Sequence, residues 1–515
     1  KPTDRLVDQL DLFLIHHFDN RARSTSLKVL EFNMRADNIS DLPFPIGTSL
    51  TQDQLPVLRA YNRHDVLQTI AFYHHSTESI RFREELTARY QRDFMNHNDT
   101  KVGKDYFVME LEAAGVQCYD YGPQGRQPRQ TRRPSIALKD AILPWINFQE
   151  PEFQRVLEWL KEQTITETKG VFKDITATVR GFTFVFGLGG IHGSVENEIL
   201  ESDEDSVIVD LDVTSYYPTL AIANGFYPQH LGQSFVDIYS HLFEQRKSYP
   251  KGSPENAMLK LALNGVYGDS NNGFSVFYDP LFTMSVTLNG QLLLCGLAEA
   301  AMGHVPGLRM IQCNTDGMTV IVPRESRLRL KQVCEWWEKL TKLTLEQVNY
   351  RRMCIRDVNN YLGQYMDGKV KRKGAYEYDM EWHQNHSALV VPKVAEKVLL
   401  EGAPIRETVE NWPDIMDFML RVKVPRSSSL VIEYRDNGTE QQFPLQNTTR
   451  YLITKTGGHL FKQMPPLKGK ELWRQIGVEA GWKVTPCNDV SEARGARVDF
   501  DWYVQEVEKL VNGLS

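Results

Sequence analysis

Two short apolar segments that end in aspartate constrain this chain more than any other feature. In residues 207–218, an alternating run of valine, isoleucine and leucine leads to Asp210 and Asp212. In residues 311–320, a second apolar run leads to Asp316. Side chains alternate between the two faces of a strand, so Asp210 and Asp212 are expected on one face. Both segments predict strands whose ends present carboxylates, the ligands that Mg²⁺ prefers.

A helical segment with one cation lies between these two strands. It runs from Lys260 to Gly268, and Lys260, Asn264 and Tyr267 are four and three positions apart. Residues at this spacing share one face of a helix. Two carboxylates for a divalent metal and a lysine for a triphosphate, in this order, indicate a nucleotidyltransferase.

The whole chain sets broad limits on the class of protein. With 515 residues it is too long for one hydrophobic core, so several subdomains are expected. A net charge of −7 does not exclude nucleic acid, because local basic segments can bind it. The six cysteines form no CxxC pair, which argues against a zinc site or a disulfide framework. No apolar run suggests a membrane span, and we expect a cytoplasmic monomer.

Element patterns add expectations for the rest of the chain. Residues 1–100 read as mostly helical, 121–134 as a basic loop punctuated by proline and glycine, and 194–206 as an acidic turn. Residues 232–268 read as two antiparallel helices broken at 249–254, and 275–302 as a long apolar helix. Residues 328–348 read as one amphipathic helix.

Three motifs together carry a family resemblance. They are Asp212-x-x-Ser215-x-Tyr217-Pro, then Lys260-x-x-x-Asn264-x-x-Tyr267-Gly268, then Thr315-Asp316 in a predicted hairpin. Their order and spacing resemble motifs A, B and C of family B DNA polymerases, in particular the compact phage and mobile-element branch. The resemblance implies an α+β right-hand polymerase, with an antiparallel palm sheet, short helical fingers and a thumb, preceded by a partial RNase H-like exonuclease domain.

The same resemblance implies a division of the chain. Residues 1–100 would be the C-terminal part of a 3′–5′ exonuclease domain, and 101–200 a linking region. Residues 201–231 would be palm, 232–268 fingers, 269–385 palm again and 386–515 thumb. Genome replication in a phage, in the cytoplasm of its host and with replisome proteins as partners, is the setting that this branch implies.

The resemblance also assigns roles to individual residues. Asp212 and Asp316, with the backbone of Val213, would bind two Mg²⁺ ions, for which Mn²⁺ can substitute. Lys260 and Arg246 would hold the triphosphate of the dNTP. The remaining pocket residues are Tyr217 beneath the sugar, where it excludes a 2′-hydroxyl, Asn264 and Tyr267 beside the nascent pair, and Ser215, Asn314, Thr315 and Gly268 in support.

Further residues would contact the primer-template DNA. Gly189 and Gly190 resemble the family's YxGG element, although its tyrosine is missing. Tyr361 lies where a Lys-x-Tyr element is usual, again without the cation, and the nearby Lys371 and Lys373 would contact the DNA backbone. Arg450 and Lys455 would bind duplex phosphates, as in a polymerase thumb. Asn314 replaces the usual first aspartate of motif C, but the family depends mainly on the second, so we expect activity to survive.

The amino-terminal part resembles only a fragment of the exonuclease. Tyr61 and Asp65 match the third exonuclease motif, in which Asp65 would bind metal and Tyr61 would orient water. No Asp-x-Glu precedes Tyr61, so this chain is not expected to proofread, whereas a longer parent chain would. Only 48 positions separate Asp212 from Lys260, which leaves no room for a terminal-protein insertion and favours a nucleic-acid primer.

Two other functions compete with DNA synthesis. One is a 3′–5′ exonuclease or repair nuclease, which requires the exonuclease carboxylates that are missing here. The other is a catalytically inactive polymerase fold that acts as a DNA-binding scaffold. Asn314 favours the scaffold, whereas Asp212, Asp316, Lys260 and Tyr217 argue against it.

Overall fold

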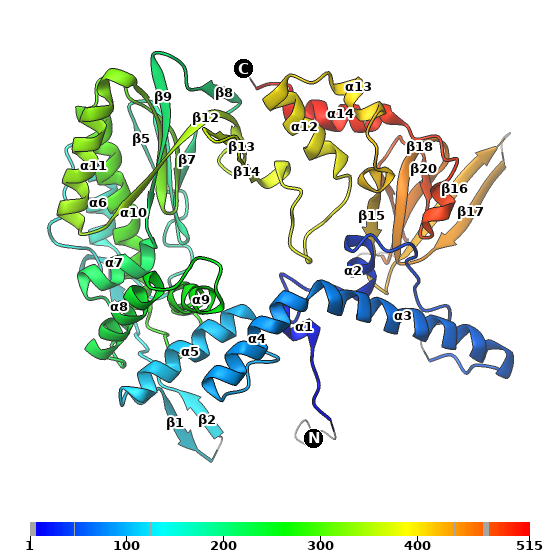
Figure 1. Cartoon of the computed structure of the whole chain (residues 1–515), viewed down its shortest axis with the longest axis horizontal. Helices are drawn as coiled ribbons and strands as arrows, with labels where there is room; N and C mark the ends of the chain where they lie inside the picture. The colour runs from blue at the N-terminus through cyan, green and yellow to red at the C-terminus, as the bar shows by residue number, and fades with distance from the viewer. Residues whose placement is uncertain (1–6, 46, 124, 437–438, 467–472, 515) are drawn as a thin grey trace. The chain divides into compact units, whose positions relative to one another are not determined.

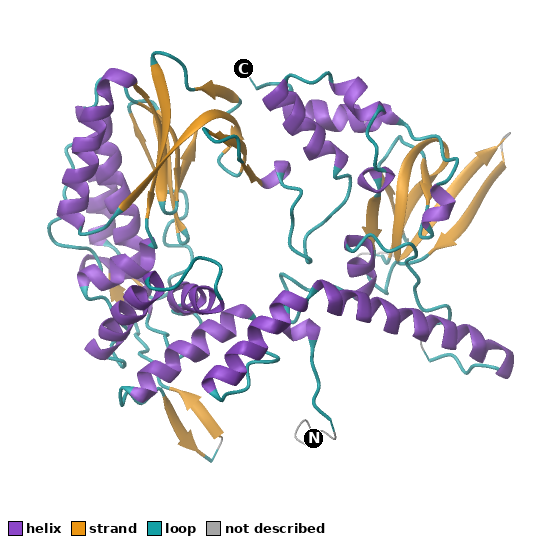
Figure 2. Ribbon diagram, viewed as in Figure 1, coloured by secondary structure: helices purple, strands orange, loops and turns teal. Residues whose placement is uncertain are grey.

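The computed structural model describes the chain apart from residues 1–6, 46, 124, 437–438, 467–472 and 515. It divides into two compact units. The terminal unit comprises Lys1–Glu84 and Ala375–Gly513, and the central unit comprises Glu85–Gly374 together with Leu514–Ser515. Both contain helices and strands, so the fold is mixed, as the sequence predicts (Figure 2).

A ten-stranded antiparallel sheet organises the central unit. Its order is β14-β13-β12-β9-β11-β10-β7-β6-β5, with β8 paired to β12. The apolar segment that ends in Asp212 forms β9, a middle strand with nearly every residue buried. Its valine and isoleucine side chains favour a strand. The strands are β5 (Thr176–Val179), β6 (Phe182–Gly187), β7 (Gly190–Ser194), β8 (Glu198–Glu201), β9 (Ser206–Val213), β10 (Arg309–Asn314), β11 (Gly317–Pro323), β12 (Leu345–Asp357), β13 (Asn360–Tyr365) and β14 (Val370–Lys373).

Helices α6 (Pro151–Glu162), α10 (Pro280–His304) and α11 (Arg327–Thr341) cover one face of this sheet (Figure 1). The long apolar helix expected near 275–302 is α10, which Asp279 caps at its N-terminus. By length and composition alone α10 is able to cross a membrane, but 89% of its apolar window is buried inside the protein. The helix expected over 328–348 stops at Thr341, because Lys342 adopts a left-handed conformation and β12 begins at Leu345.

A helical layer beside the sheet carries the predicted lysine motif. It contains α7 (Tyr216–Asn224), α8 (Gln233–Lys247) and α9 (Pro254–Asp269), and the break between α8 and α9 falls where the sequence predicts it. The Ser253 side chain accepts a hydrogen bond from Asn256 N at the start of α9. Helix α5 (Asp99–Ala113) packs so closely on α9 that a Cβ on Gly103 would lie 2.4 Å from the backbone of Leu261.

Two segments that read as loops contain strands instead. The basic segment 121–134 begins inside a hairpin of β1 (Tyr119–Gly122) and β2 (Gly125–Pro128), and the acidic segment 194–206 contains β8. Cross-strand pairing in each overrides the local composition. The central unit also contains β3 (Ile136–Ala137), paired with β4 (Thr164–Ile165), and the end of α4 (Thr77–Tyr90).

The terminal unit joins two segments that lie far apart in the sequence. Ile39 N donates to Asn488 O over 3.0 Å, and Val490 N donates to Asp37 O over 2.8 Å. Its helices are α1 (Leu12–Ile15), α2 (Leu27–Asn33), α3 (Leu55–His75), α12 (Val390–Glu401), α13 (Ile405–Glu410) and α14 (Phe500–Val511). Its six-stranded sheet contains β15 (Leu420–Lys423), β16 (Ser429–Asp436), β17 (Thr439–Leu445), β18 (Thr448–Met464), β19 (Arg474–Val478) and β20 (Val484–Pro486).

Candidate active site

The two predicted carboxylates meet at one end of the central sheet. Asp212 on β9 lies opposite Gly317 on β11 and opposite Glu346 on β12. Strands β10 and β11 are joined by the two-residue turn Thr315-Asp316, and Val213 N donates to Asp316 O over 2.7 Å. This bond fastens the turn that carries Asp316 to the end of the strand that carries Asp212.

Gly317 makes room for the Asp212 carboxylate. A Cβ at this position would lie 2.2 Å from Asp212 Oδ1 and 2.4 Å from Leu211 O. A side chain on residue 317 is therefore incompatible with the present position of Asp212. This gives a local physical reason for glycine directly after Asp316.

A pocket of about 750 Å³ opens over these carboxylates. It brings together ten of the residues that the sequence singles out, from β9, the β10–β11 turn, α7, α8 and α9. They are Asp212, Val213, Ser215, Tyr217, Arg246, Lys260, Asn264, Tyr267, Thr315 and Asp316. Asn314 and Gly268 do not line it: the Asn314 amide donates to Gln312 Oε1, and Gly268 lies near the end of α9.

The floor of the pocket concentrates negative charge. The pKa of Asp212 is raised to about 7: burial is the largest cause, the neighbouring Asp210, Asp316 and Glu346 carboxylates add to the rise, and Lys371 opposes it. Glu346 is a third carboxylate in the lining that sequence reasoning missed. Oxygen ligands grouped in this way suit Mg²⁺, and a bound cation would offset the repulsion between them. The residues present therefore fit a divalent metal ion.

Asp210 shares a face with Asp212 but does not line the pocket. It is 6% exposed, accepts hydrogen bonds from Thr319 Oγ1 (2.6 Å) and Tyr350 OH (3.1 Å), and lies 3.7 Å from Lys371 Nζ. Burial alone would lower the pKa of Lys371, but the nearby carboxylates raise it overall. Lys371 is thus paired inside the protein, and its expected contact with the DNA backbone is not supported.

Basic side chains from α8, α9 and the loop between them also line the pocket. They are Arg246, Lys247, Lys251 and Lys260, and the sequence had pointed only to Arg246 and Lys260. Arg246 donates to Ser215 Oγ over 3.4 Å, but its Nε is buried without a hydrogen-bond partner among the described residues. Burial therefore lowers the pKa of Arg246. No carboxylate among the described residues pairs with this guanidinium, so it is available to an anion in the pocket.

Two tyrosines close one side of the pocket against a glycine turn. The ring centroids of Tyr217 and Tyr267 are 4.2 Å apart. Tyr217 OH donates to Gly189 O over 2.8 Å, and Tyr267 OH donates to Leu188 O over 3.3 Å. The turn that the sequence associates with template DNA thus supports the two predicted nucleotide-binding tyrosines.

The same turn also touches the Asp316 hairpin. Gly190 has a φ of +141°, and a Cβ there would lie 2.8 Å from the Thr315 side chain. His192, two residues further along β7, lies with Nε2 3.2 Å from Thr315 Oγ1. Glycine is required at position 190 by both its backbone conformation and this close approach.

Two of the predicted DNA contacts are wrong because the side chains are buried. Tyr361 is 3% exposed and packs in a core cluster with Tyr350 and Ile355. Arg450 is 0% exposed, and its guanidinium donates to the backbone carbonyls of Cys487, Ala36, Asp37 and Asn488. Lys373 and Lys455 are exposed, so their expected contacts with DNA stay predictions.

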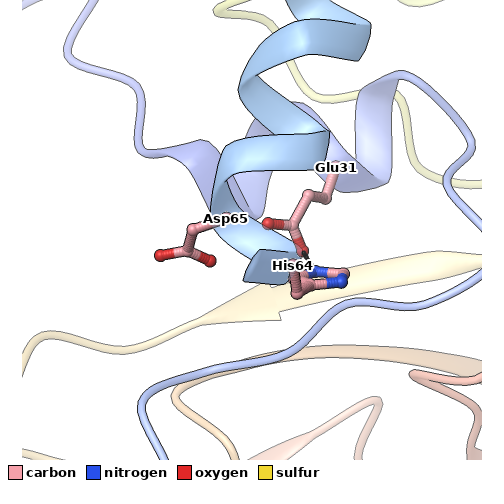
Figure 3. A group of neighbouring side chains, drawn as sticks. All are labelled: Glu31, His64 and Asp65. Carbon is pink, nitrogen blue, oxygen red and sulfur yellow. Dashed lines mark hydrogen bonds and ion pairs between the residues drawn. The ribbon is translucent and has the colours of Figure 1, made fainter. Parts of the chain in front are cut away.

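The amino-terminal motif forms a separate cluster in the terminal unit. His64 and Asp65 on α3 lie beside Glu31 of α2, with His64 Nε2 3.2 Å from Glu31 Oε2 (Figure 3). Lys28 lies 2.9 Å from Glu31 Oε1 and also pairs with Asp65. Burial, with a hydrogen bond to Asp65, raises the pKa of Tyr61 to about 12. Tyr61 and Asp65 do interact, but a lysine already neutralises part of the cluster.

Comparisons with known proteins add little beyond this geometry. No protein-family model matches the chain, and no curated protein matches it. Among solved structures, the chain is similar to the family B DNA polymerase of the hyperthermophilic archaeon Pyrobaculum calidifontis, with a TM-score of 0.45 and 14% sequence identity. The match covers 98% of this chain and 63% of the archaeal polymerase, so this chain spans less than two thirds of that protein. A similarity at this level assigns no function.

Proposed function

We propose that the protein is a DNA-directed DNA polymerase, which transfers a dNMP from a dNTP to the 3′-hydroxyl of a primer. The observation that carries the proposal is the pocket that Asp212 and Asp316, 104 positions apart in the chain, line together with Lys260 and Arg246. Carboxylates and cations around one pocket suit two metal ions and a triphosphate. The aromatic residues Tyr217 and Tyr267 line the space that a sugar and base would occupy.

The roles of the residues follow from phosphoryl-transfer chemistry. Bound Mg²⁺ would activate the primer hydroxyl and neutralise the leaving pyrophosphate. Asp212 and Asp316 would hold the metal ions, while Lys260 and Arg246 would bind the phosphates and fix their orientation. Positioning and charge stabilisation account for most catalysis of this kind, so no strong acid or base is required.

Tyr217 would select the sugar. Its hydroxyl donates to Gly189 O, and its ring lies against Tyr267, so the side chain is held on both sides. A ring fixed beneath the sugar would collide with a 2′-hydroxyl and exclude ribonucleotides. We expect Tyr217→Ala to raise ribonucleotide incorporation, and an unchanged sugar preference would remove this role.

Primer extension tests the central assignment. Wild type with Mg²⁺ should extend a primed DNA template, and Asp212→Asn and Asp316→Asn should each lower the rate by about 10²–10³-fold, the range typical of essential electrostatic groups. Asp205→Asn, in the exposed turn before β9, is the matched control and should extend like wild type. A wild type that binds primer-template but never extends it would favour the inactive scaffold. Retained extension by either active-site variant would contradict the metal-binding roles.

Within this proposal, the central unit would supply palm and fingers. The sheet around β9 and β11 would be the palm and α8 with α9 the fingers, while residues 386–515 would act as a thumb and 1–100 as an exonuclease fragment without proofreading. A nucleic-acid primer, phage genome replication in a host cytoplasm and replisome partners belong to the same proposal.

A further inference from the structure

An arginine-rich segment of the central unit lies outside the proposed active site. Residues 121–134 contain four arginines and no acidic residue, in a chain whose net charge is −7. The segment begins in the β1–β2 hairpin, which is labelled in Figure 1, and continues toward α10. The roles proposed above for the pocket leave this concentration of positive charge unexplained.

An exposed aromatic ring stands next to this segment. Phe274, in the loop between α9 and α10, is 89% exposed. Its loop is nevertheless fixed, because the Gln130 amide donates to Gly273 O (2.9 Å) and Ser275 O (2.8 Å) on either side of it. Phe274 is therefore a solvent-exposed aromatic residue on a loop that is hydrogen-bonded to the arginine-rich segment.

A histidine fastens the same segment from the other side. His230 Nε2 donates to Val276 O over 2.7 Å, so Nδ1 accepts from the Thr131 hydroxyl at 3.0 Å. The Thr131 hydroxyl in turn accepts from His230 N over 3.1 Å. Residues 130–131, 230 and 273–276 are thereby joined into one fixed surface.

These residues surround a second pocket, of about 690 Å³. Arg129, Arg132, Gln127, Gln130 and Phe274 line it, together with one acidic residue, Asp120. Asp120 pairs with Arg129 over 2.8 Å. Arg132 has no carboxylate partner among the described residues; it donates to Gln130 Oε1 and lies 5.9 Å from the Tyr278 ring centroid.

Helix α10 relates this second pocket to the proposed active site. At its start, Asp279 binds Arg133 of the arginine-rich segment. Eight residues later, Thr287 bonds to Tyr267 OH of the nucleotide pocket. The stretch of α10 between these two contacts rises roughly 12 Å over its eight residues.

We propose that this surface, defined by Arg129, Arg132 and Phe274, binds single-stranded nucleic acid. On the function proposed above, the ligand is the unpaired template strand ahead of the templating base. Cations that follow the phosphates and an aromatic ring on which a base stacks are the two components of sequence-independent single-strand binding. The arginines alone would suit any polyanion, but the exposed, fixed ring beside them favours unstacked bases.

Direct binding tests the site without requiring catalysis. The probe is a fluorescein-labelled 12-nucleotide oligo(dT), and the variants are Phe274→Ala, Arg132→Ala and their combination. Loss of one stacked base corresponds to at least about fivefold weaker binding, and loss of Arg132 should reduce the salt dependence of binding by about one unit of slope. Trp336→Ala, which removes a 51%-exposed ring from α11, should bind like wild type.

Primer-templates of different overhang locate the site along the strand. The double variant should lose affinity for a duplex with a 5′ template overhang of ten nucleotides and retain affinity for one with an overhang of two. An equal loss of affinity on both substrates would overturn the inference, and so would an unchanged affinity for oligo(dT). Tight binding of a folded protein from phage or host would also overturn it, if the oligonucleotide does not displace that protein. If wild type does not extend primers but the oligo(dT) difference stands, the proposed function fails and the single-strand site survives.

Discussion

Asp210 and Asp212 show how neighbouring residues of one type acquire different chemistry. Both lie on the same face of β9, as strand alternation predicts. Asp210 is enclosed by Thr319, Tyr350 and Lys371, whereas Asp212 lines the pocket with Asp316. Partners from distant strands decide which carboxylate remains available to a metal ion.

Asp212→Asn is expected to stabilise the metal-free protein at pH 8. The pKa of Asp212 is raised from 3.8 to about 7, so between these values the native state keeps a proton that the unfolded chain has lost. The free energy of unfolding therefore falls as the pH rises through this window, and asparagine removes that loss. We expect a rise in Tm of about 2–4 °C, which corresponds to ~1 kcal/mol in a unit of this size.

Thermal melts in EDTA at pH 8 and pH 5 measure this effect. The difference in Tm between wild type and variant should be smaller at pH 5. At that pH a smaller part of the free-energy cost of ionising Asp212 in the native state is present. Added Mg²⁺ should raise the Tm of wild type more than that of the variant. Identical melting of the two proteins at pH 8 would contradict the raised pKa.

Arg450→Met is expected to lower the free energy of unfolding of the terminal unit by at least about 3 kcal/mol. It would leave several buried carbonyls without donors, and each costs roughly 1–3 kcal/mol. The matched variant Lys455→Ala removes an exposed cation from the same strand and should change stability by about 0.5 kcal/mol or less. Urea unfolding measures both.

DNA binding separates the two residues further. Anisotropy with primer-template DNA should show weaker binding for Lys455→Ala and unchanged binding for folded Arg450→Met. Weakened DNA binding by a stable Arg450→Met protein would restore the original interpretation of that residue.

At the scale of elements, helices α5 and α9 pack closely against each other. Gly103 allows their backbones to meet, and Lys104 of α5 pairs with Asp269 of α9 over 2.9 Å. Leu261 follows Lys260 directly. The position of Lys260, the residue proposed to bind the triphosphate, therefore depends on α5, a helix that carries no sequence motif. The linking region 101–200 thus gains a structural role through α5.

Gly103→Ala is expected to destabilise the central unit by about 1–3 kcal/mol, as overpacking does, and to raise the KM for dNTP more than it lowers kcat. Gly296→Ala is the control, since a Cβ there meets nothing within 4 Å and alanine favours a helix interior by about 0.5–1 kcal/mol. Chemical unfolding and steady-state extension kinetics measure the two effects. An unchanged KM in a destabilised Gly103→Ala protein would show that α5 does not position Lys260.

Sequence patterns predicted the elements whose signals are local. The apolar alternation before Asp212, the turn at Thr315-Asp316 and the break between α8 and α9 all appear where expected. Glu346 was missed because residues 342–348 continue the amphipathic pattern of α11, and only pairing with β9 makes them a strand. That pairing joins segments more than a hundred residues apart, which no local pattern encodes.

The predicted DNA contacts of two buried polar residues were wrong for a related reason. Arginine and tyrosine in a basic, hydroxyl-rich segment are typical of a DNA-facing surface. The Arg450 guanidinium instead donates hydrogen bonds to carbonyls near residue 37 and near residue 488. Tyr361 instead packs in an apolar cluster that includes Ile208 and Ile311. Burial of such groups depends on partners that the neighbouring sequence does not specify.

At the scale of the whole molecule, the chain forms its terminal unit from two separated segments. Deletion of residues 1–41 is expected to abolish the melting transition of that unit and to leave the transition of the central unit in place. The deletion removes the carbonyl partners of Arg450 at residues 36 and 37 and the partner of Asn488 at Ile39. Deletion of residues 1–8, which ends before α1, is the control.

Differential scanning calorimetry, with limited proteolysis to identify the surviving segment, measures this effect. We expect two transitions in the full chain and one after deletion of residues 1–41. Loss of both transitions in that variant would contradict the independence of the central unit.

The discontinuous terminal unit has a consequence for the protein's biosynthesis. A ribosome must translate the 290 residues of Glu85–Gly374 before it reaches the second segment of this unit. At about 5–20 residues per second, that interval is roughly 15–60 s. During this time the nascent amino-terminal helices lack the strand that will cover them, while the inserted unit can already collapse on the growing chain. The early segment is therefore the part most dependent on chaperones.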